Sequence, residues 1–339
     1  MSRDRLLIDG CEINNWDAET IEELRRGGVD AVQATCAVWE DARGAIGRLL
    51  DWRDRFVRHA DAVVPAHSAA DVEAAHRDGR TAVVLGFQNT APIEDDPRLL
   101  EVFWTLGTRV IQLTYNSQNA VGGSCFEPRD AGLSRFGHTV VSEMNRLGLL
   151  IDCSHVGDRT TREAIDASSA PIAITHANPR WFCDHPRNKP DDVLAALARR
   201  GGVVGVTLYP TFIGGSDVRL EDFAGMVTRL VDQLGADHVA IGTDLARNWT
   251  DADLVALRHG RQLRNPPPAS WPQWPAWFRS AADLPRVIDG LAAGGIDDGT
   301  IDKIAGGNWM RLYDDVFSRN AHATDVERDD AADLGTAAR

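Results

Sequence analysis

The stretch LLIDCSHVGDRTTREAIDASSAPIAITHAN (149–178) decides the fold. It opens and closes with runs rich in apolar and β-branched residues, 149–155 and 171–178, and the intervening residues 159–168 have helical spacing. Two such runs around a helix predict a pair of parallel strands with a crossover helix packed on the sheet. A histidine stands near the end of each predicted strand.

The same alternation continues in both directions from this stretch. Eight strand-like runs are predicted, at 6–9, 31–38, 81–89, 109–116, 149–155, 171–178, 202–210 and 238–245. Helical segments accompany them, at 18–27, 40–59, 69–79, 97–106, 137–147, 159–168, 190–200, 220–235, 283–293 and 298–317. Near-continuous apolar strands are buried on both faces, which favours a parallel sheet with helices outside. Eight units predict a single (β/α)₈ barrel of the TIM type over residues 1–317.

An open, doubly wound sheet is the main alternative to the barrel. That fold predicts a glycine-rich, pyrophosphate-binding turn after the first strand. The chain instead reads IDGCEINN at 8–15, with a single glycine. The barrel is therefore favoured.

Residues 246–280 interrupt the alternation after the eighth strand. They contain three consecutive prolines and four tryptophans. Long loops that follow barrel strands lie over the active face, so we expect this segment to form a lid or wall of the site. A proline-rich surface excursion or a subunit contact is the alternative. The final residues, 318–339, are small and acidic without periodicity, which predicts a frayed tail.

Composition and charge narrow the class of protein. Of 339 residues, 43% are hydrophobic and 25% charged, as in globular proteins. The net charge of −14 repels phosphate backbones and anionic lipid, so neither nucleic acid nor membrane is an expected partner. No run is long enough to span a bilayer, and the first residues lack the apolar core of a signal peptide. Five scattered cysteines without a CxxC pair indicate reduced thiols and a cytoplasmic protein.

Polar residues gather where the predicted strands end, which is where barrels place their chemistry. In chain order they are Cys11, Glu12, Cys36, Gln88, Asn89, Tyr115, Asn116, His155, His176, Tyr209 and Asp244. Two histidines on consecutive strands, with an aspartate on the last, are typical of a divalent metal site in a hydrolase. The alternative is that both histidines are satisfied residues of the barrel rim.

Four segments carry a resemblance to a known family. They are DCSHVGDRT (152–160), PIAITHANPRWFCDHPRNKPDDV (171–193), HVAIGTDL (238–245) and GGNWMRLYDDV (306–316). Together they resemble the membrane (renal) dipeptidase family, peptidase family M19, which has an amidohydrolase-like barrel. The resemblance covers roughly residues 6–317 in the same order.

The resemblance implies a site that holds two zinc ions. The family's ligands are a histidine and an aspartate after the first strand, a bridging glutamate after the third, and histidines after the fifth and sixth. His155 and His176 match the last two. Cys11, Ile13 and Gln88 stand where the first histidine, the aspartate and the bridging glutamate are usual.

The resemblance also implies roles for three residues outside the metal set. Arg187 matches the family's carboxylate-binding arginine, and Asp244 matches the aspartate of its eighth strand. Tyr115 replaces a histidine that contacts substrate. The alternative for Arg187 is an ordinary ion pair with Asp191 or Asp192.

These departures predict at most one ion per chain. A neutral amide cannot offset the charge between two dications as a bridging carboxylate does. We expect one divalent ion, zinc before others, on His155 and His176, with Gln88 and Cys11 as further candidate ligands. A site without metal is the alternative, and Cys11 is then a small buried hydrophobe.

The expected function is hydrolysis of a C–N bond in a dipeptide or small amino-acid derivative. Arg187 would bind the substrate carboxylate, Asp244 would take the proton, and Tyr115 would stabilise the oxyanion. Asn89 and Asn116 would hydrogen-bond the ligand. Ordinary dipeptides should be poor substrates, because the bridging carboxylate is missing.

Two other functions stay open at this point. One is a metal-independent lyase or isomerase on the same barrel, in amino-acid or betaine catabolism; the other is a ligand-binding homologue without catalysis. The resemblance also implies a homodimer.

Overall fold

The computed structural model describes residues 5–319. The predicted frayed tail, 318–339, lies outside the described residues from residue 320 onward. Within residues 5–319, no helix is both long and apolar enough to cross a membrane.

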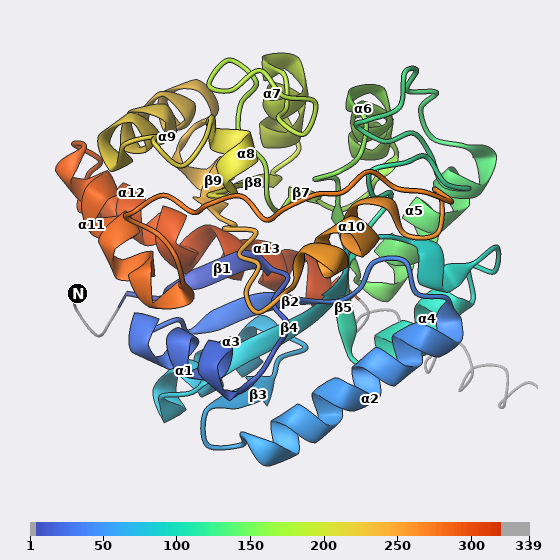
Figure 1. The fold of residues 1–339 in the computed structure, drawn as a ribbon, viewed down its shortest axis with the longest axis horizontal. Coiled ribbons are helices and arrows are strands. Elements are labelled where there is room, and N and C mark those ends of the chain that lie inside the picture. The colour runs from blue at the N-terminus through green and yellow to red at the C-terminus, as the bar shows by residue number, and fades with distance from the viewer. Residues whose placement is uncertain (1–4, 320–339) are drawn as a thin grey trace, which may run out of the picture.

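Eight parallel strands form the barrel, in the order β1-β2-β4-β5-β6-β7-β8-β9 (Figure 1). Their bounds are β1 Ile8–Glu12, β2 Ala31–Ala37, β4 Thr81–Phe87, β5 Thr108–Gln112, β6 Leu150–Asp152, β7 Ala173–Ile174, β8 Val203–Val206 and β9 Val239–Ile241. The ring closes where Glu12 bridges Leu245 and the Ile13 amide donates to the Leu245 carbonyl over 2.8 Å. The predicted (β/α)₈ barrel is confirmed.

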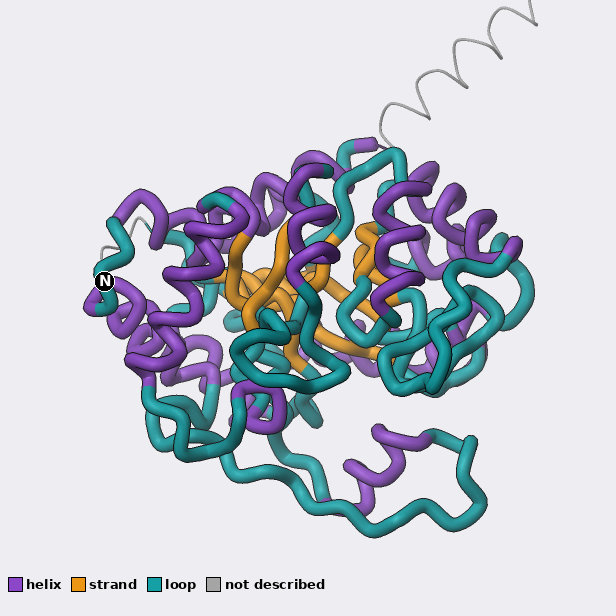
Figure 2. The backbone as a smooth tube through the Cα atoms, turned by 90° about the horizontal axis from the view of Figure 1, so that it is seen from above, coloured by secondary structure: helices purple, strands orange, loops and turns teal. Residues whose placement is uncertain are grey.

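Helices surround the strands, as both views show (Figures 1 and 2). Those predicted from the sequence are α1 Ala18–Gly27, α2 Ala42–Arg58, α3 Ala69–Asp78, α4 Leu99–Thr105, α5 Arg135–Leu147, α6 Asp158–Ala167, α7 Asp191–Arg199, α9 Leu220–Leu234, α11 Leu284–Ala293, α12 Asp298–Asp302 and α13 Asn308–Phe317. Local signals set their ends. In α1, Asp17 and Thr20 form a capping box, and Gly28 ends the helix at a φ of 62°.

Four features differ from the sequence-based expectation. A short strand, β3 (Val63–Pro65), pairs with β4 outside the ring, and a short helix, α8 (Pro210–Ile213), follows β8. A further helix, α10 (Asp251–His259), lies inside the 246–280 segment. The predicted helix 298–317 is divided by a π-helical turn, Lys303–Gly307, because its paired glycines weaken the helical ladder.

Apolar side chains fill the interior of the barrel at the amino ends of the strands. Near their amino ends all eight strands contribute an apolar residue to one cluster, which α13 completes with Trp309, Leu312 and Tyr313. Trp309 lies so close to the strands that a Cβ on Gly10 would be 2.2 Å from its ring. A second apolar layer lies between the strands and the outer helices. The carboxyl ends of the strands are thus left for the site.

Candidate active site and metal centre

A cavity of about 520 Å³ lies at the carboxyl ends of the strands. The strand ends contribute Tyr115, Asn116, His155, Tyr209 and Asp244 to its lining, and the 246–280 segment contributes Ala246, Leu254, Leu257, Arg258, His259, Pro267 and Trp271. In Figures 1 and 2 this segment, with α10, runs along one side of the strands. It therefore forms part of the cavity wall.

Hydrogen bonds define the proton positions on both histidines. Nδ1 of His155 lies 2.7 Å from Oδ1 of Asn116, an atom that only accepts, so Nδ1 carries the proton. Nδ1 of His176 lies 2.7 Å from Oγ1 of Thr175, whose own hydroxyl donates to Asp152 over 2.8 Å. Nδ1 of His176 is therefore the donor in its pair. Both Nε2 atoms are left with a free lone pair.

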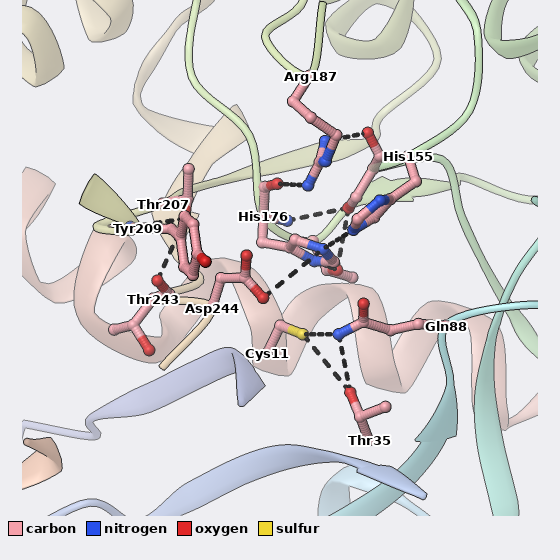
Figure 3. Close-up of polar contacts among 12 residues, drawn as sticks. Cys11, Thr35, Gln88, His155, His176, Arg187, Thr207, Tyr209, Thr243 and Asp244 are labelled. Carbon is pink, nitrogen blue, oxygen red and sulfur yellow. Dashed lines mark hydrogen bonds and ion pairs between the residues drawn. The ribbon is translucent and has the colours of Figure 1, made fainter. Parts of the chain in front are cut away.

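These two lone pairs converge in a buried layer beneath the cavity, whose lining includes His155 and Asp244 but not His176. We call this layer the floor. The Nε2 atoms of His155 and His176 are 3.1 Å apart (Figure 3). Burial, reinforced by the charge of Arg187, holds the pKa of both imidazoles well below its ordinary value, which disfavours a shared proton. Tetrahedral zinc with bonds near 2.0–2.1 Å separates two nitrogens by about 3.3 Å. The pair therefore fits a metal cation.

Cys11, Gln88 and Thr35 lie on the opposite side of this buried layer, and none of them lines the cavity itself (Figure 3). Nε2 of Gln88 donates to Sγ of Cys11 over 3.2 Å and to Oγ1 of Thr35 over 2.9 Å. Burial raises the pKa of the Cys11 thiol well above its ordinary value, and the charge of Asp244 adds to the shift. Ligand atoms of Cys11, His176 and Asp244 all lie within 4.8 Å of one another. The predicted ligand Cys11 is thus close to the histidines, on a side whose groups bond one another.

Asp244 lies beside the histidines on a strained piece of backbone. Its φ is 58°, and its amide donates to the Cys11 carbonyl over 2.9 Å. Its Oδ1 is 4.0 Å from Nε2 of His176. Burial raises the pKa of its carboxyl to about 7, against the opposing charge of Arg187. Such a group can accept or hold a proton near neutral pH.

Arg187 is fully buried and joins the ends of β6 and β7. One terminal nitrogen donates to the carbonyl of Ser154, and the other donates to the carbonyl of His176 over 3.0 Å. Its guanidinium lies 4.8 Å from the ring centre of Phe212, and Phe212 lines the cavity. Asp192 pairs with Arg162 instead. The contact of Arg187 with a substrate carboxylate stays a prediction, while its contacts here support the two histidine-bearing strands.

The remaining predicted residues occupy different places. Tyr115 stacks on the His155 ring with 4.1 Å between centres, and Asn116, with a φ of 57°, orients the same imidazole. Asn89 is buried and accepts from Asn119 over 3.0 Å, so the structure does not bring it to the cavity lining. Its amide is used by a neighbouring loop.

Sequence reasoning missed two parts of the site. Asp152 accepts hydrogen bonds from Ser154 and Thr175, and thereby fixes the polar layer below the histidines. The D-x-S spacing within a strand was its only local signal. Arg258 enters the cavity from α10, and the capping box of Thr250 with Asp253 could have revealed that helix.

A barrel with convergent imidazoles and a carboxylate at its strand ends defines a class, the metal-dependent hydrolases. A family model described as membrane dipeptidase (peptidase family M19) matches residues 10–253. The dipeptidase verJ of Clonostachys rogersoniana is 30% identical over 92% of this chain and 79% of its own length. The dipeptidase aclJ of Aspergillus oryzae is also 30% identical, over 79% of this chain, and the match spans 60% of that protein.

Solved structures share the fold of this chain. An amidohydrolase from Pseudomonas aeruginosa is 34% identical, with a TM-score of 0.89 over 93% of this chain and 98% of that one. A metallopeptidase from Rhodobacter sphaeroides, solved with a phosphinate mimic of L-Ala-D-Ala, shares the fold at 20% identity, with a TM-score of 0.75 over 92% of this chain and all of that one. The chain belongs to the membrane dipeptidase family, peptidase family M19. Membership favours a hydrolase over the lyase, isomerase and binding-protein alternatives.

Proposed function

We propose that this protein is a mononuclear metal-dependent hydrolase that cleaves a C–N bond in a dipeptide or small amino-acid derivative. One observation carries the proposal: two buried, unprotonated imidazole nitrogens converge at 3.1 Å beside Asp244 on the cavity floor. Family membership supports the reaction class. The identity of the substrate is left open by the 30% identity to the curated dipeptidases.

His155, His176 and Cys11 would hold the ion, with zinc as the proposed metal. Imidazole and thiolate are ligands that zinc favours, and the amide oxygen of Gln88 is a weaker one. A bound dication would supply Lewis-acid polarisation of the scissile carbonyl. It would also offset the negative charge of a Cys11 thiolate, which burial otherwise disfavours.

The protein's own residues would position the substrate and move the proton. Asp244 is placed to take a proton from the attacking water, because the pKa of its carboxyl lies near 7. Burial raises the pKa of Tyr115, so its hydroxyl stays protonated and can donate to a developing oxyanion. Asn116 keeps the His155 ring turned so that Nε2 faces the floor.

We also propose a cytoplasmic homodimer that binds neither nucleic acid nor membrane. The five free cysteines support a reducing compartment, and the net charge of −14 supports the absence of anionic partners. Exposed apolar side chains on α2 and α4, including Val57 and Val102, support a subunit contact. Light scattering at micromolar concentration tests the dimer, and Val57→Glu should favour the monomer.

Metal analysis combined with hydrolysis of a dipeptide panel tests the proposed reaction. We expect one zinc or less per chain, weak turnover of ordinary dipeptides, loss of turnover on chelation, and recovery with one equivalent of metal. Two well-occupied ions per chain would contradict the proposal. Full turnover by protein that elemental analysis shows to be metal-free would contradict it as well.

A further inference from the structure

A second cavity, of about 470 Å³, lies between α2 and α10, beside the cavity of the proposed active site. Its volume is within the range of small-molecule binding sites and close to that of the first cavity. Ile13 and Leu257 line both cavities, so we call these two side chains the partition. His155, Tyr209 and Asp244 line only the first cavity. The second cavity is therefore a separate place for a ligand.

Four tryptophans line the second cavity, in two pairs. Trp16 and Trp52 are buried and pack on each other, with 5.2 Å between ring centres. Trp39 and Trp249 are half-buried, so part of each side chain stays accessible. Their indole Nε1 atoms donate to the carbonyls of the two partition residues, over 2.8 and 2.5 Å. Aromatic surface that is fixed before a ligand arrives suits a planar aromatic ring.

Arg55 of α2 places a cation in the same cavity. Its Nε donates to the Trp16 carbonyl over 3.2 Å, and its guanidinium lies 5.4 Å from the ring centre of Trp52. Within residues 5–319, its two terminal nitrogens have no hydrogen-bond partner, and no carboxylate lies within 4.0 Å of them. The guanidinium is thus held in place while the N–H donors of both terminal nitrogens stay free. That arrangement suits a carboxylate or a phosphate.

The other charged side chains of this cavity favour an anion over a cation. Oε2 of Glu40 accepts from two backbone amides, and its Oε1 accepts from Nε of Arg48 over 3.1 Å. Asp253 is engaged in the capping box of α10, and Asp51 is exposed. In the described part of the chain, the terminal nitrogens of Arg48 and Arg261 have no acceptor. The cations of the cavity are therefore less satisfied than its acids.

Two polar atoms on residues that line this cavity lack partners as well. Within the described residues, Oδ1 of Asn14 accepts no hydrogen bond and Nε1 of Trp16 donates none. Both side chains are more than nine-tenths buried, and buried polar atoms are normally hydrogen-bonded. The Trp16 carbonyl is also the group that holds Arg55. A ligand with a polar group beside its ring can supply the missing partners.

We propose that the cavity between α2 and α10 is a second ligand site, which binds a planar aromatic molecule that carries an anionic group. Trp39 and Trp249 contact the ring, and Arg55 binds the anion. Carboxylate and phosphate share the chemistry that this arginine recognises. The site uses no metal, and the inference does not rest on the proposed hydrolysis.

The experiment compares aromatic anions with matched neutral and non-aromatic molecules. Indoleacetate, indoleacetamide, adenosine monophosphate, adenosine and cyclohexylacetate are titrated into the purified full-length protein by calorimetry. The variants are Arg55→Gln and Trp249→Leu, with thermal melting as the folding check. Arg53→Gln is the matched control, because Arg53 is exposed on the same helix and does not line the cavity. His176→Ala reports binding at the metal floor instead.

Wild-type protein should bind indoleacetate or adenosine monophosphate at least tenfold more tightly than the neutral partner, and cyclohexylacetate more weakly than indoleacetate. Arg55→Gln should weaken binding of the anion about 10- to 100-fold and leave the neutral partner unchanged, because it removes a charged hydrogen bond. Trp249→Leu should weaken both by a similar factor, since both lose the aromatic contact. Arg53→Gln and His176→Ala should match the wild type.

The inference is overturned if neither anion binds at millimolar concentration, or if Arg55→Gln binds the anion as tightly as the wild type. Loss of binding in His176→Ala would overturn it too, because the ligand would then occupy the metal floor. Binding of only one of the two anions supports the inference and identifies which anionic group the site takes. Equal binding of indoleacetate and cyclohexylacetate would reject the aromatic part of the proposal.

Discussion

The two sides of the cavity floor differ in how their polar groups are satisfied. On the β6–β7 side, the outer nitrogens of the histidines donate to Asn116 and Thr175, and both inner nitrogens are left free. On the β1–β4 side, Gln88 donates inward to Cys11 and Thr35, so these groups satisfy one another. The first side leaves lone pairs free for a metal, whereas on the second side, which we call the closed side, only Cys11 is a proposed ligand and its neighbours bond one another.

On the proposal of a single ion, this difference explains how the site keeps its structure without a second metal. Removing one partner from a buried polar pair leaves the other unsatisfied, at a cost of about 1–3 kcal/mol. Replacing several ligands together by groups that bond one another avoids that cost. Gln88 does this: its amide donates to Cys11 and Thr35 without adding a charge, and the histidine side is unchanged.

The largest expected effect follows from removing a histidine. His176→Ala should abolish stoichiometric metal binding and lower kcat/KM by roughly 10³-fold or more, because His155 and Cys11 alone are too few ligands to hold the ion. Gln88→Ala, its counterpart on the closed side, should cost about tenfold or less. Elemental analysis and kinetics check both, with thermal melting as the folding control. Equal losses in the two variants would remove the distinction between the sides.

The next effect is a pH dependence of stability in the metal-free protein. The folded protein keeps Asp244 protonated up to about pH 7 and Asp9 up to about pH 6, whereas both ionise near 3.8 when unfolded. The unfolded chain therefore binds fewer protons between pH 4 and 7, and the free energy of unfolding should fall as pH rises through that window. Asp244 alone would account for on the order of 2–4 kcal/mol.

Denaturant titrations in the presence of a chelator measure this dependence. Asp244→Asn should flatten the fall between pH 4 and 7, and added zinc should flatten it in the wild type, since metal favours the ionised carboxylate. If the curve of Asp244→Asn runs parallel to that of the wild type, burial does not raise the pKa of the Asp244 carboxyl, and the prediction is wrong.

A smaller effect should follow from releasing the His155 ring. Asn116→Ala removes the acceptor for Nδ1–H and should weaken metal affinity about 10- to 100-fold, as for other outer partners of metal-binding histidines. Thr35→Val, the matched loss on the closed side, should change it less than about threefold. Competition with a chelating dye gives both affinities. Unchanged affinity in Asn116→Ala would show that the ring is oriented by packing on Tyr115 alone.

The smallest expected effect comes from restoring the family's usual metal ligands on the closed side. The triple variant Cys11→His, Ile13→Asp and Gln88→Glu should raise the metal content from one ion or less towards two, because it returns charged ligands to the closed side. Elemental analysis of folded protein is the readout. A content that stays at the wild-type value would show that the family's ligand positions were matched wrongly onto the first strand.

The sequence predicted what depends on repeating local patterns. All eight barrel strands could be predicted because buried parallel strands are continuous apolar runs. β3 was missed because it has three residues, one of them Pro65, and α10 was hidden beside a proline-rich stretch despite its capping box. His155 and His176 could be placed at one floor because they end consecutive strands.

What the sequence could not supply depends on contacts between distant segments. The orientation of His155 depends on Asn116, whose left-handed backbone and contact with Arg258, 142 positions away, have no local signature. The burial of Arg187 depends on Phe212 packing across it. Motif matching gave Arg187 a role, and only the packing shows which of its donors are already engaged.

The helix that fills the lower barrel also has a consequence for the order of folding. Trp309 belongs to α13, after the last strand, whereas Gly10, which makes room for its ring, belongs to the first. The lower interior cannot become dry until α13 docks, so the contacts that complete it span almost the whole described chain. Contacts of such high sequence separation make folding slow. During synthesis from the amino end, the strands emerge before the helix that fills the amino end of the barrel. We therefore expect cooperative stability only once residues 308–317 have been made.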